Sequence, residues 1–236
     1  MGVLVGLAED VQAGVDGVLA PNWVSRDGSV VPETADIALK NGAVHLDATY
    51  LYADMADSTG LAQGHHDWAA AKVIRCYLNA ASRIIRDRGG AIRSFDGDRV
   101  MGIFIGSSKN SDAAKAALNI NWAVKEVIRP KLSEKWDSFT WVMNHGVGID
   151  TGKAMLVRGG VHGQNDIISI GKAPNIAAKL SDVRGSYPLL ITREVHDRLN
   201  EKSKYASGND MWTEVGTATF GGKSVDYLGS RYTWEP

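Results

Sequence analysis

The chain lacks several features of secreted, membrane and nucleic-acid-binding proteins. Cys76 is the only cysteine in 236 residues, which excludes an internal disulfide. No apolar run reaches the length of about 20 residues that a membrane helix needs. Residues 1–20 carry acids where a secretion signal has a basic segment. The formal net charge of −1 gives no overall attraction for nucleic acid or anionic membranes. We therefore expect a cytoplasmic protein that binds no nucleic acid and no membrane.

What is present is the composition of an ordinary globular protein, with 44% hydrophobic and 22% charged residues. A chain of this length can bury a core without disulfides, and we expect Cys76, in an apolar helical stretch, to be a reduced core residue. We predict an N-terminal arm or helical extension over residues 1–40, with a short helix within Val3–Leu19, and a main domain over residues 41–236. Whether the arm packs on that domain or on a partner subunit stays open.

Strands and helices alternate regularly from His45 onward. The spacing of apolar residues predicts strands at 45–53, 91–95, 100–105, 141–149, 153–158, 166–170, 189–192, 212–218 and 224–228. It predicts helices at 66–88, 112–128, 172–183 and 193–202. The order is β-α-β-β-α-β with additional C-terminal strands and an N-terminal extension. This order predicts an α+β fold of the ferredoxin-like split βαββαβ type.

Three local signals divide these elements. The dipeptide Asp96-Gly97 predicts a tight turn between the second and third strands. Residues 150–152 (Asp-Thr-Gly) predict a hairpin turn between strands 141–149 and 153–158. Pro130 is expected to end the helix that precedes it, because proline lacks the amide that a helix interior requires.

Two acids, Asp54 and Asp98, stand where predicted strands end. Asp54 follows a strand-like run and begins a polar turn that contains Asp57, Ser58 and Thr59. That turn fits a helix N-cap, and it equally fits backbone amides that receive a triphosphate beside a metal on Asp54. Asp98 follows the glycine of the predicted hairpin turn. Carboxylates from adjacent strand ends are typical of a two-metal phosphoryl-transfer site.

Four segments in this order resemble the motifs of the class III nucleotidyl cyclases, the group of adenylate and guanylate cyclases. The match spans roughly 46–180 and is weaker to about 228. Residues 52–59 resemble the first metal motif, and residues 95–98 with the strand at 100–104 resemble the second. Residues 146–152 resemble the central hairpin, and residues 171–180 resemble the helix that stabilises the transition state.

The resemblance implies a role for each matching residue. Asp54, Asp98 and the Met55 carbonyl would bind two divalent ions, Mn²⁺ or Mg²⁺. Asn175 would orient the ribose, and Lys179 would neutralise charge on the α-phosphate. Lys223 would reach the terminal phosphates, although its spacing is longer than the family pattern. Without the resemblance, Asn175 reads as a helix-start residue and Lys179 as a solvated lysine. The family's sites also imply a homodimer in which Asp54 and Asp98 come from one subunit and Asn175 and Lys179 from the other.

The chain departs from the family at the positions that select the base. Ser94 and Ile168 stand where adenylate cyclases have a lysine and an acid or threonine, and where guanylate cyclases have a glutamate and a cysteine. Tyr50 shares a strand face with Asp54 and adds bulk and a hydroxyl, unless it is only a core tyrosine. Lys179 replaces the arginine that the family usually has, which keeps the charge and loses the planar fork.

These departures resemble the pyrimidine cyclases of bacterial anti-phage defence. They imply conversion of UTP to cyclic UMP and pyrophosphate, with the product read by a separate effector protein. Three other readings remain open: a cytidylate cyclase making cyclic CMP, an adenylate cyclase with unusual base contacts, and a degenerate cyclase domain that only senses nucleotide. A palm-type polymerase shares the split architecture by analogy alone. We interpret His145 and His162 as ordinary polar residues, because neither has a ligand companion at metal-binding spacing.

Overall fold

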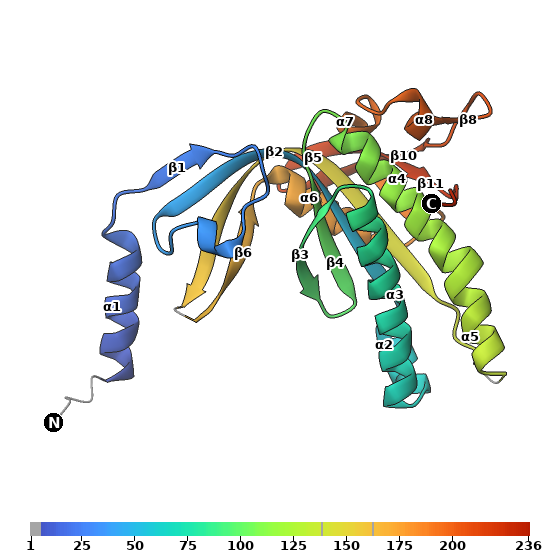
Figure 1. Cartoon of the computed structure of the whole chain (residues 1–236), viewed down its shortest axis with the longest axis horizontal. Coiled ribbons are helices and arrows are strands. Elements are labelled where there is room, and N and C mark those ends of the chain that lie inside the picture. Colours follow the sequence, from blue (N-terminus) through green and yellow to red (C-terminus); the bar gives the residue numbers. More distant parts are fainter. Residues whose placement is uncertain (1–5, 138, 162) are drawn as a thin grey trace. The chain divides into compact units, whose positions relative to one another are not determined.

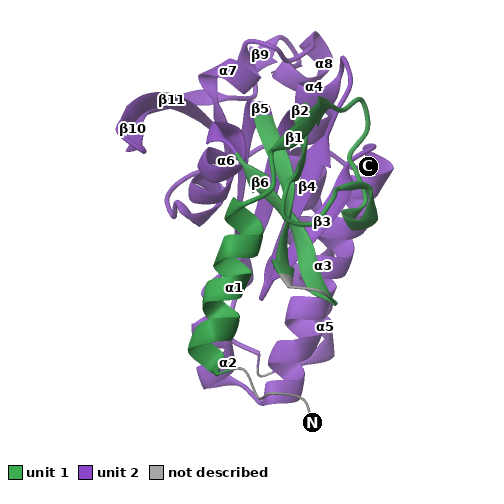
Figure 2. Cartoon of the chain, turned by 90° about the vertical axis from the view of Figure 1, so that its left-hand side faces the viewer, with its two compact units in different colours: residues 1–46, 154–170 green, residues 47–153, 171–236 purple. Residues whose placement is uncertain are grey.

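The computed structural model describes residues 6–137, 139–161 and 163–236, and His162 therefore lies outside the described residues. The chain divides into two compact units (Figure 2), one of residues 1–46 with 154–170 and one of residues 47–153 with 171–236. Two long strands, β2 (Gly42–Ala56) and β5 (Asn144–Val161), begin in one unit and end in the other. Among the described residues, no helix combines the length and the apolar character that a bilayer span requires.

The first unit contains a helix and short strands beside the ends of β2 and β5. Strand β1 (Val24–Asp27) pairs in parallel with the first residues of β2, and β6 (Gln164–Ile170) pairs antiparallel with the last residues of β5. Helix α1 (Leu7–Leu19) lies within the range predicted for it and buries none of its residues. A short 3₁₀ turn, η1, covers Thr34–Asp36.

The second unit is built on a mixed sheet with the strand order β10-β11-β7-β5-β2-β4-β3. The four strands β5-β2-β4-β3 with their two connecting helices are the predicted split βαββαβ arrangement, which is confirmed. The bounds of the other strands of this sheet are Ala91–Asp96 for β3, Arg99–Phe104 for β4, Leu189–Thr192 for β7, Thr213–Phe220 for β10 and Lys223–Ser230 for β11. Strands β8 (Tyr205–Ala206) and β9 (Asn209–Asp210) form a separate pair.

Helices α3 (Asp67–Asp87) and α4 (Lys109–Trp122) pack together and supply much of the main core (Figure 1). Their apolar residues meet the odd-numbered residues of β2, such as Leu51, Ala53 and Met55, because alternate residues of a strand face the same side. The remaining helices are α2 (Ser58–Gly64), α5 (Arg129–Lys135), α6 (Lys172–Asp182), α7 (Arg193–His196) and α8 (Glu201–Lys204).

Two predictions of where elements end were wrong. Residues 150–152 do not form a turn, because β5 continues through them and its hairpin partner is β6, not a strand at 153–158. Gly152, inside the strand, has a φ of 153°. Pro130 does not end the helix, because a wider π-helical segment, η2 (Ala123–Ile128), precedes it and α5 begins around it.

Cys76 is free and exposed, so the prediction of a core residue was wrong. The buried stripe of α3 passes through Val73 and Tyr77, and one residue along a helix turns the side chain by about 100°. That rotation is enough to move Cys76 from the edge of the apolar stripe to the surface.

Candidate active site

The two predicted metal carboxylates come from neighbouring strands of the second unit. Asp54 pairs with Arg99 across β2 and β4, and its side chain is only 12% exposed. The β3–β4 register pairs Asp96 with Arg99, so the turn consists of Gly97 and Asp98 and not of Asp96 and Gly97. Asp98 thus sits in the turn itself. Because β2 and β4 are hydrogen-bonded neighbours, both acids lie at the same end of this strand pair.

The electrostatics of the pair favour a cation. Burial raises the pKa of Asp54, the hydrogen bond from Arg184 lowers it, and the negative charge of Asp98 raises it again. The Oδ2 atom of Asp98 is buried and has no hydrogen-bond partner among the described residues. A buried carboxylate oxygen without a partner is unfavourable unless a ligand satisfies it. Two nearby acids, one with an unsatisfied oxygen, are a donor set that suits a hard divalent ion.

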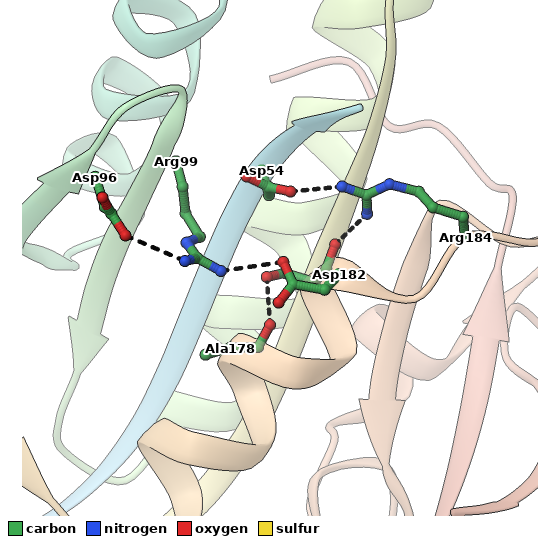
Figure 3. A network of polar contacts seen from close by, with 7 residues as sticks. Asp54, Asp96, Arg99, Ala178, Asp182 and Arg184 are labelled. Atoms are coloured by element: carbon green, nitrogen blue, oxygen red, sulfur yellow. Dashed lines mark hydrogen bonds and ion pairs between the residues drawn. The ribbon is translucent and has the colours of Figure 1, made fainter. Parts of the chain in front are cut away.

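Two arginines pair with carboxylates around Asp54 (Figure 3). Arg184 Nη2 lies 2.5 Å from Asp54 Oδ2, and Arg184 Nη1 donates to the Ser181 carbonyl. Arg99 bridges Asp96 at 3.2 Å and Asp182, at the end of α6, at 3.0 Å. Sequence reasoning does not single out Arg184, because it follows α6 in a loop at no recognisable spacing from Asp54.

The described residues contain no group of three or more His, Cys, Asp and Glu side chains that could hold a metal. Asp54 and Asp98 therefore require other oxygens to complete a metal site. Backbone carbonyls and substrate phosphates are common additional ligands for Mg²⁺. Met55, the residue after Asp54, stays the predicted carbonyl ligand.

The turn after β2 is held by Asp57. Asp57 has a left-handed φ of 59°, and its Oδ1 accepts from the Gly60 amide at 3.2 Å as the N-cap of α2. Its Oδ2 accepts from the Trp141 indole at 3.3 Å. The side chain thus has the capping role, while Ser58 and Thr59 form the first turn of the helix, where backbone amides point outward.

Helix α6 presents the two predicted transition-state residues on its exposed side. Asn175 and Lys179 are one turn apart and exposed, whereas Ile176 and Leu180 are buried. Lys179 Nζ lies 5.6 Å from the ring centre of Phe220, which pairs with Lys223 across the β10–β11 hairpin. The structure therefore brings Lys179 and the hairpin of Lys223 together, although 44 residues separate them in sequence.

The three predicted base-selecting residues come from different environments. Tyr50 is fully buried on β2, as a core tyrosine would be. The β3–β4 register shifts between Ile92 and Ser94, so simple alternation along β3 cannot assign the face on which Ser94 lies. Ile168 belongs to the first unit, on β6, and is 51% exposed. Their roles stay predictions.

His145 is a buried polar residue, 6% exposed, whose Nε2 lies 3.1 Å from the Asn121 side chain. Burial and the charges of Arg129, Lys125 and Arg184 lower its pKa from 6.5 to about 3. In the unfolded chain it gains a proton near pH 6.5, which the folded state resists. The free energy of unfolding therefore decreases as the pH falls from about 6.5 to about 3.

We expect the unfolding free energy to fall by about 2 kcal/mol between pH 7 and pH 5 through His145. His145→Gln should remove that part of the pH dependence, which urea unfolding at several pH values measures. His66→Gln, at an exposed histidine, is the control and should leave the slope as it is. An unchanged slope in His145→Gln would contradict the assignment.

Comparison with known proteins identifies the family. The chain is 44% identical over 214 residues to a protein of Rhodovulum sp. (strain MB263) named uridylate cyclase, and the match covers 88% of this chain and 89% of that protein. It is 38% identical over 231 residues to a uridylate cyclase of Xanthomonas perforans, with 98% and 99% covered. The crystal structure of the adenylyl cyclase CyaB from P. aeruginosa has a TM-score of 0.63 and 24% identity, with 80% of this chain and 95% of that chain covered. No protein-family model matches the chain. The chain belongs to the uridylate cyclase family and has the class III nucleotidyl cyclase fold.

Proposed function

We propose that this protein cyclises UTP to cyclic UMP and pyrophosphate. The 3′-oxygen of the ribose attacks the α-phosphorus, the bond between the α-phosphorus and the bridging oxygen breaks, and the hydroxyl proton is released. The observation that carries the proposal is the Asp54 and Asp98 pair, with its unsatisfied buried oxygen, in a chain 38–44% identical to proteins named uridylate cyclase.

Each of the predicted site residues has a separate role in this reaction. Two divalent ions, Mn²⁺ or Mg²⁺, held by Asp54, Asp98 and the Met55 carbonyl, would supply the acidity that lowers the pKa of the 3′-hydroxyl. Asn175 orients the ribose. Lys179 neutralises charge that grows on the α-phosphate as pyrophosphate leaves.

The triphosphate is received by two further elements. Asp57 fixes the turn that directs the amides of Ser58 and Thr59 towards the phosphates. Lys223 reaches the terminal phosphates from the β10–β11 hairpin. The exposed positions of Asn175 and Lys179 support a homodimer in which they serve the partner subunit's carboxylates.

We also propose how the base is selected and what the product does in the cell. Tyr50 and Ser94 narrow the base pocket, so that a pyrimidine fits and a purine does not, and Ile168 occupies the family's other base-selecting position. Unsatisfied polar edges of a wrong base cost about 1–3 kcal/mol per group. The cyclic nucleotide serves as a cytoplasmic second messenger in anti-phage defence and is read by a separate effector protein.

Purified protein incubated with ATP, GTP, CTP or UTP and manganese is expected to make cyclic UMP from UTP, with products identified by mass spectrometry. Cyclic CMP as the main product would keep the pyrimidine selection and overturn the choice of uridine. Cyclic AMP would overturn the argument from Tyr50, Ser94 and Ile168. Nucleotide binding without any product would favour the nucleotide-sensing alternative.

A further inference from the structure

A cavity of about 510 Å³ opens in the second unit beside the metal carboxylates. It lies between the helical stretch of α4, η2 and α5, the start of β5, the loop from α6 to β7 and the C-terminal segment. Its wall includes Ala56, two residues after Asp54 on β2. Its polar lining residues are Asn121, Lys125, Arg129, Asn144, His145, Arg184, Ser186, Tyr187 and Arg231. This volume is within the range of small-ligand sites.

Four cationic side chains line the cavity and no carboxylate does. Lys125 donates to the Arg231 carbonyl at 3.0 Å, Arg129 to the Met143 carbonyl at 2.7 Å, and Arg231 to the Ser186 carbonyl at 2.5 Å. Within the described part of the chain, none of these three forms an ion pair. Neutral oxygens orient the three charges without cancelling them, so the cavity keeps a positive potential.

The closeness of these cations also affects the pKa of Lys125. The pKa of Lys125 is lowered first by burial and then by Arg129, with a smaller contribution from Arg231, while Glu126 acts in the opposite direction. Repulsion among these cations is relieved by a bound anion. His145 also lines the cavity, but its Nε2 donates to Asn121 Oδ1, so its buried Nδ1 is an acceptor and gives an anion no hydrogen bond.

Arg184 joins this cavity to the metal site. It lines the cavity, while its Nη2 lies 2.5 Å from Asp54 Oδ2. Asp54 would exchange that contact for a divalent ion when it holds one, and the Arg184 guanidinium would then have phosphate as its alternative partner on the cavity side. Arginine suits this exchange, because its planar fork binds carboxylate and phosphate alike.

We propose that this cavity is a polyphosphate-binding site, with Lys125, Arg129, Arg184 and Arg231 as its cationic wall. Two sources have this chemistry: the phosphate tail of the nucleotide with the pyrophosphate it releases, or an independent inorganic polyphosphate. In the first case the inference rests on the proposed function. In the second it does not.

The test is calorimetric titration of the metal-free protein with inorganic pyrophosphate at low ionic strength. Wild-type protein should bind, and Lys125→Gln and Arg129→Gln should each bind about tenfold more weakly. Lys131→Gln, whose ammonium pairs with Glu134 outside the cavity, is the matched control and should bind as wild type does. Lys125→Glu is the second variant if Arg129→Gln unfolds, and it should abolish binding.

Two results would overturn the site: no binding by the wild type at millimolar pyrophosphate, or equal binding by wild type and Lys125→Glu. A non-hydrolysable UTP analogue then distinguishes the sources. Displacement of pyrophosphate by the analogue supports the nucleotide's own phosphates as the ligand, and simultaneous binding supports an independent polyphosphate. Because no cyclisation is measured, failure here is separate from failure of the proposed function.

Discussion

Asp98→Ala is expected to lower cyclic UMP formation by about a thousandfold or more, because a metal that stabilises the transferring phosphate contributes several kcal/mol. Asp98 supplies the buried oxygen that has no hydrogen-bond partner in the described part of the chain, so little else in the site can replace it. The fold should not suffer. Asp98 also raises the pKa of the buried Asp54, and removing this repulsion should leave the melting temperature equal or higher.

The matched control is Asp96→Ala, in the same hairpin. Asp96 is largely exposed and pairs with Arg99, so its loss should change activity by less than about threefold. Mn²⁺ binding, followed by electron paramagnetic resonance, should weaken in Asp98→Ala and not in Asp96→Ala. An equal loss of activity and Mn²⁺ binding in both variants would contradict the assignment. It would show that the hairpin is needed for folding and that Asp98 has no specific role in holding the metal.

Mixing Asp98→Ala with Asn175→Ala chains tests whether the site is shared between subunits. Random exchange makes half of the dimers mixed, and each mixed dimer has one intact composite site, so activity should recover to about a quarter of wild type. Verified mixed dimers with no recovered activity would rule out the shared arrangement.

Gly148→Ala should have the second large effect. Gly148 lies in β5 under α6, and a Cβ there would overlap the Ala177 carbonyl and the Ser181 amide and lie 2.7 Å from the Leu180 Cβ. Backbone atoms cannot move aside as a flexible side chain can, so we expect a destabilisation of about 3 kcal/mol. For a chain of this size, that is a fall in melting temperature of roughly 6–12 °C.

The same change should reduce activity more than stability alone explains. Helix α6 carries Asn175 and Lys179, and a shift of about 1 Å in such a group can cost a hundredfold in rate. Activity is measured well below the melting temperature of the variant. Gly14→Ala, in the middle of α1 with open space around it, is the control and should stabilise slightly. Wild-type activity in a folded Gly148→Ala would contradict this role for the α6 position.

Features that are local and periodic could be predicted from the sequence. Alternation and helical spacing predicted the split βαββαβ order, because those patterns depend on residues within one element. Asp54 and Asp98 could be predicted as a pair because each stands near a strand end, and the structure places both at the same end of β2 and β4. The i, i+4 spacing of Asn175 and Lys179 is enough to place both on one face of a helix.

Local signals failed where distant partners overrule them. Residues 150–152 have turn composition, yet β5 continues through them because it pairs with β7 before them and with β6 after them. Pro130 stays within a helical segment because it stands in the first turn of α5, where a helix tolerates a residue without an amide hydrogen. The register shift between Ile92 and Ser94 breaks the alternation along β3, so the face of Ser94 cannot be read from sequence spacing.

Residue order and spacing were sufficient for the fold class and to predict that Asp54 and Asp98 lie close together, whereas the cations around these acids are set only by the folded chain. Arg184 lies 130 residues from Asp54, and Arg231 lies 106 residues from Lys125, the residue that contacts its carbonyl. A local sequence pattern cannot predict contacts between residues so far apart in the chain, because these contacts form only in the folded protein. The cationic cavity beside the carboxylates is therefore a property of the folded chain and of no single motif.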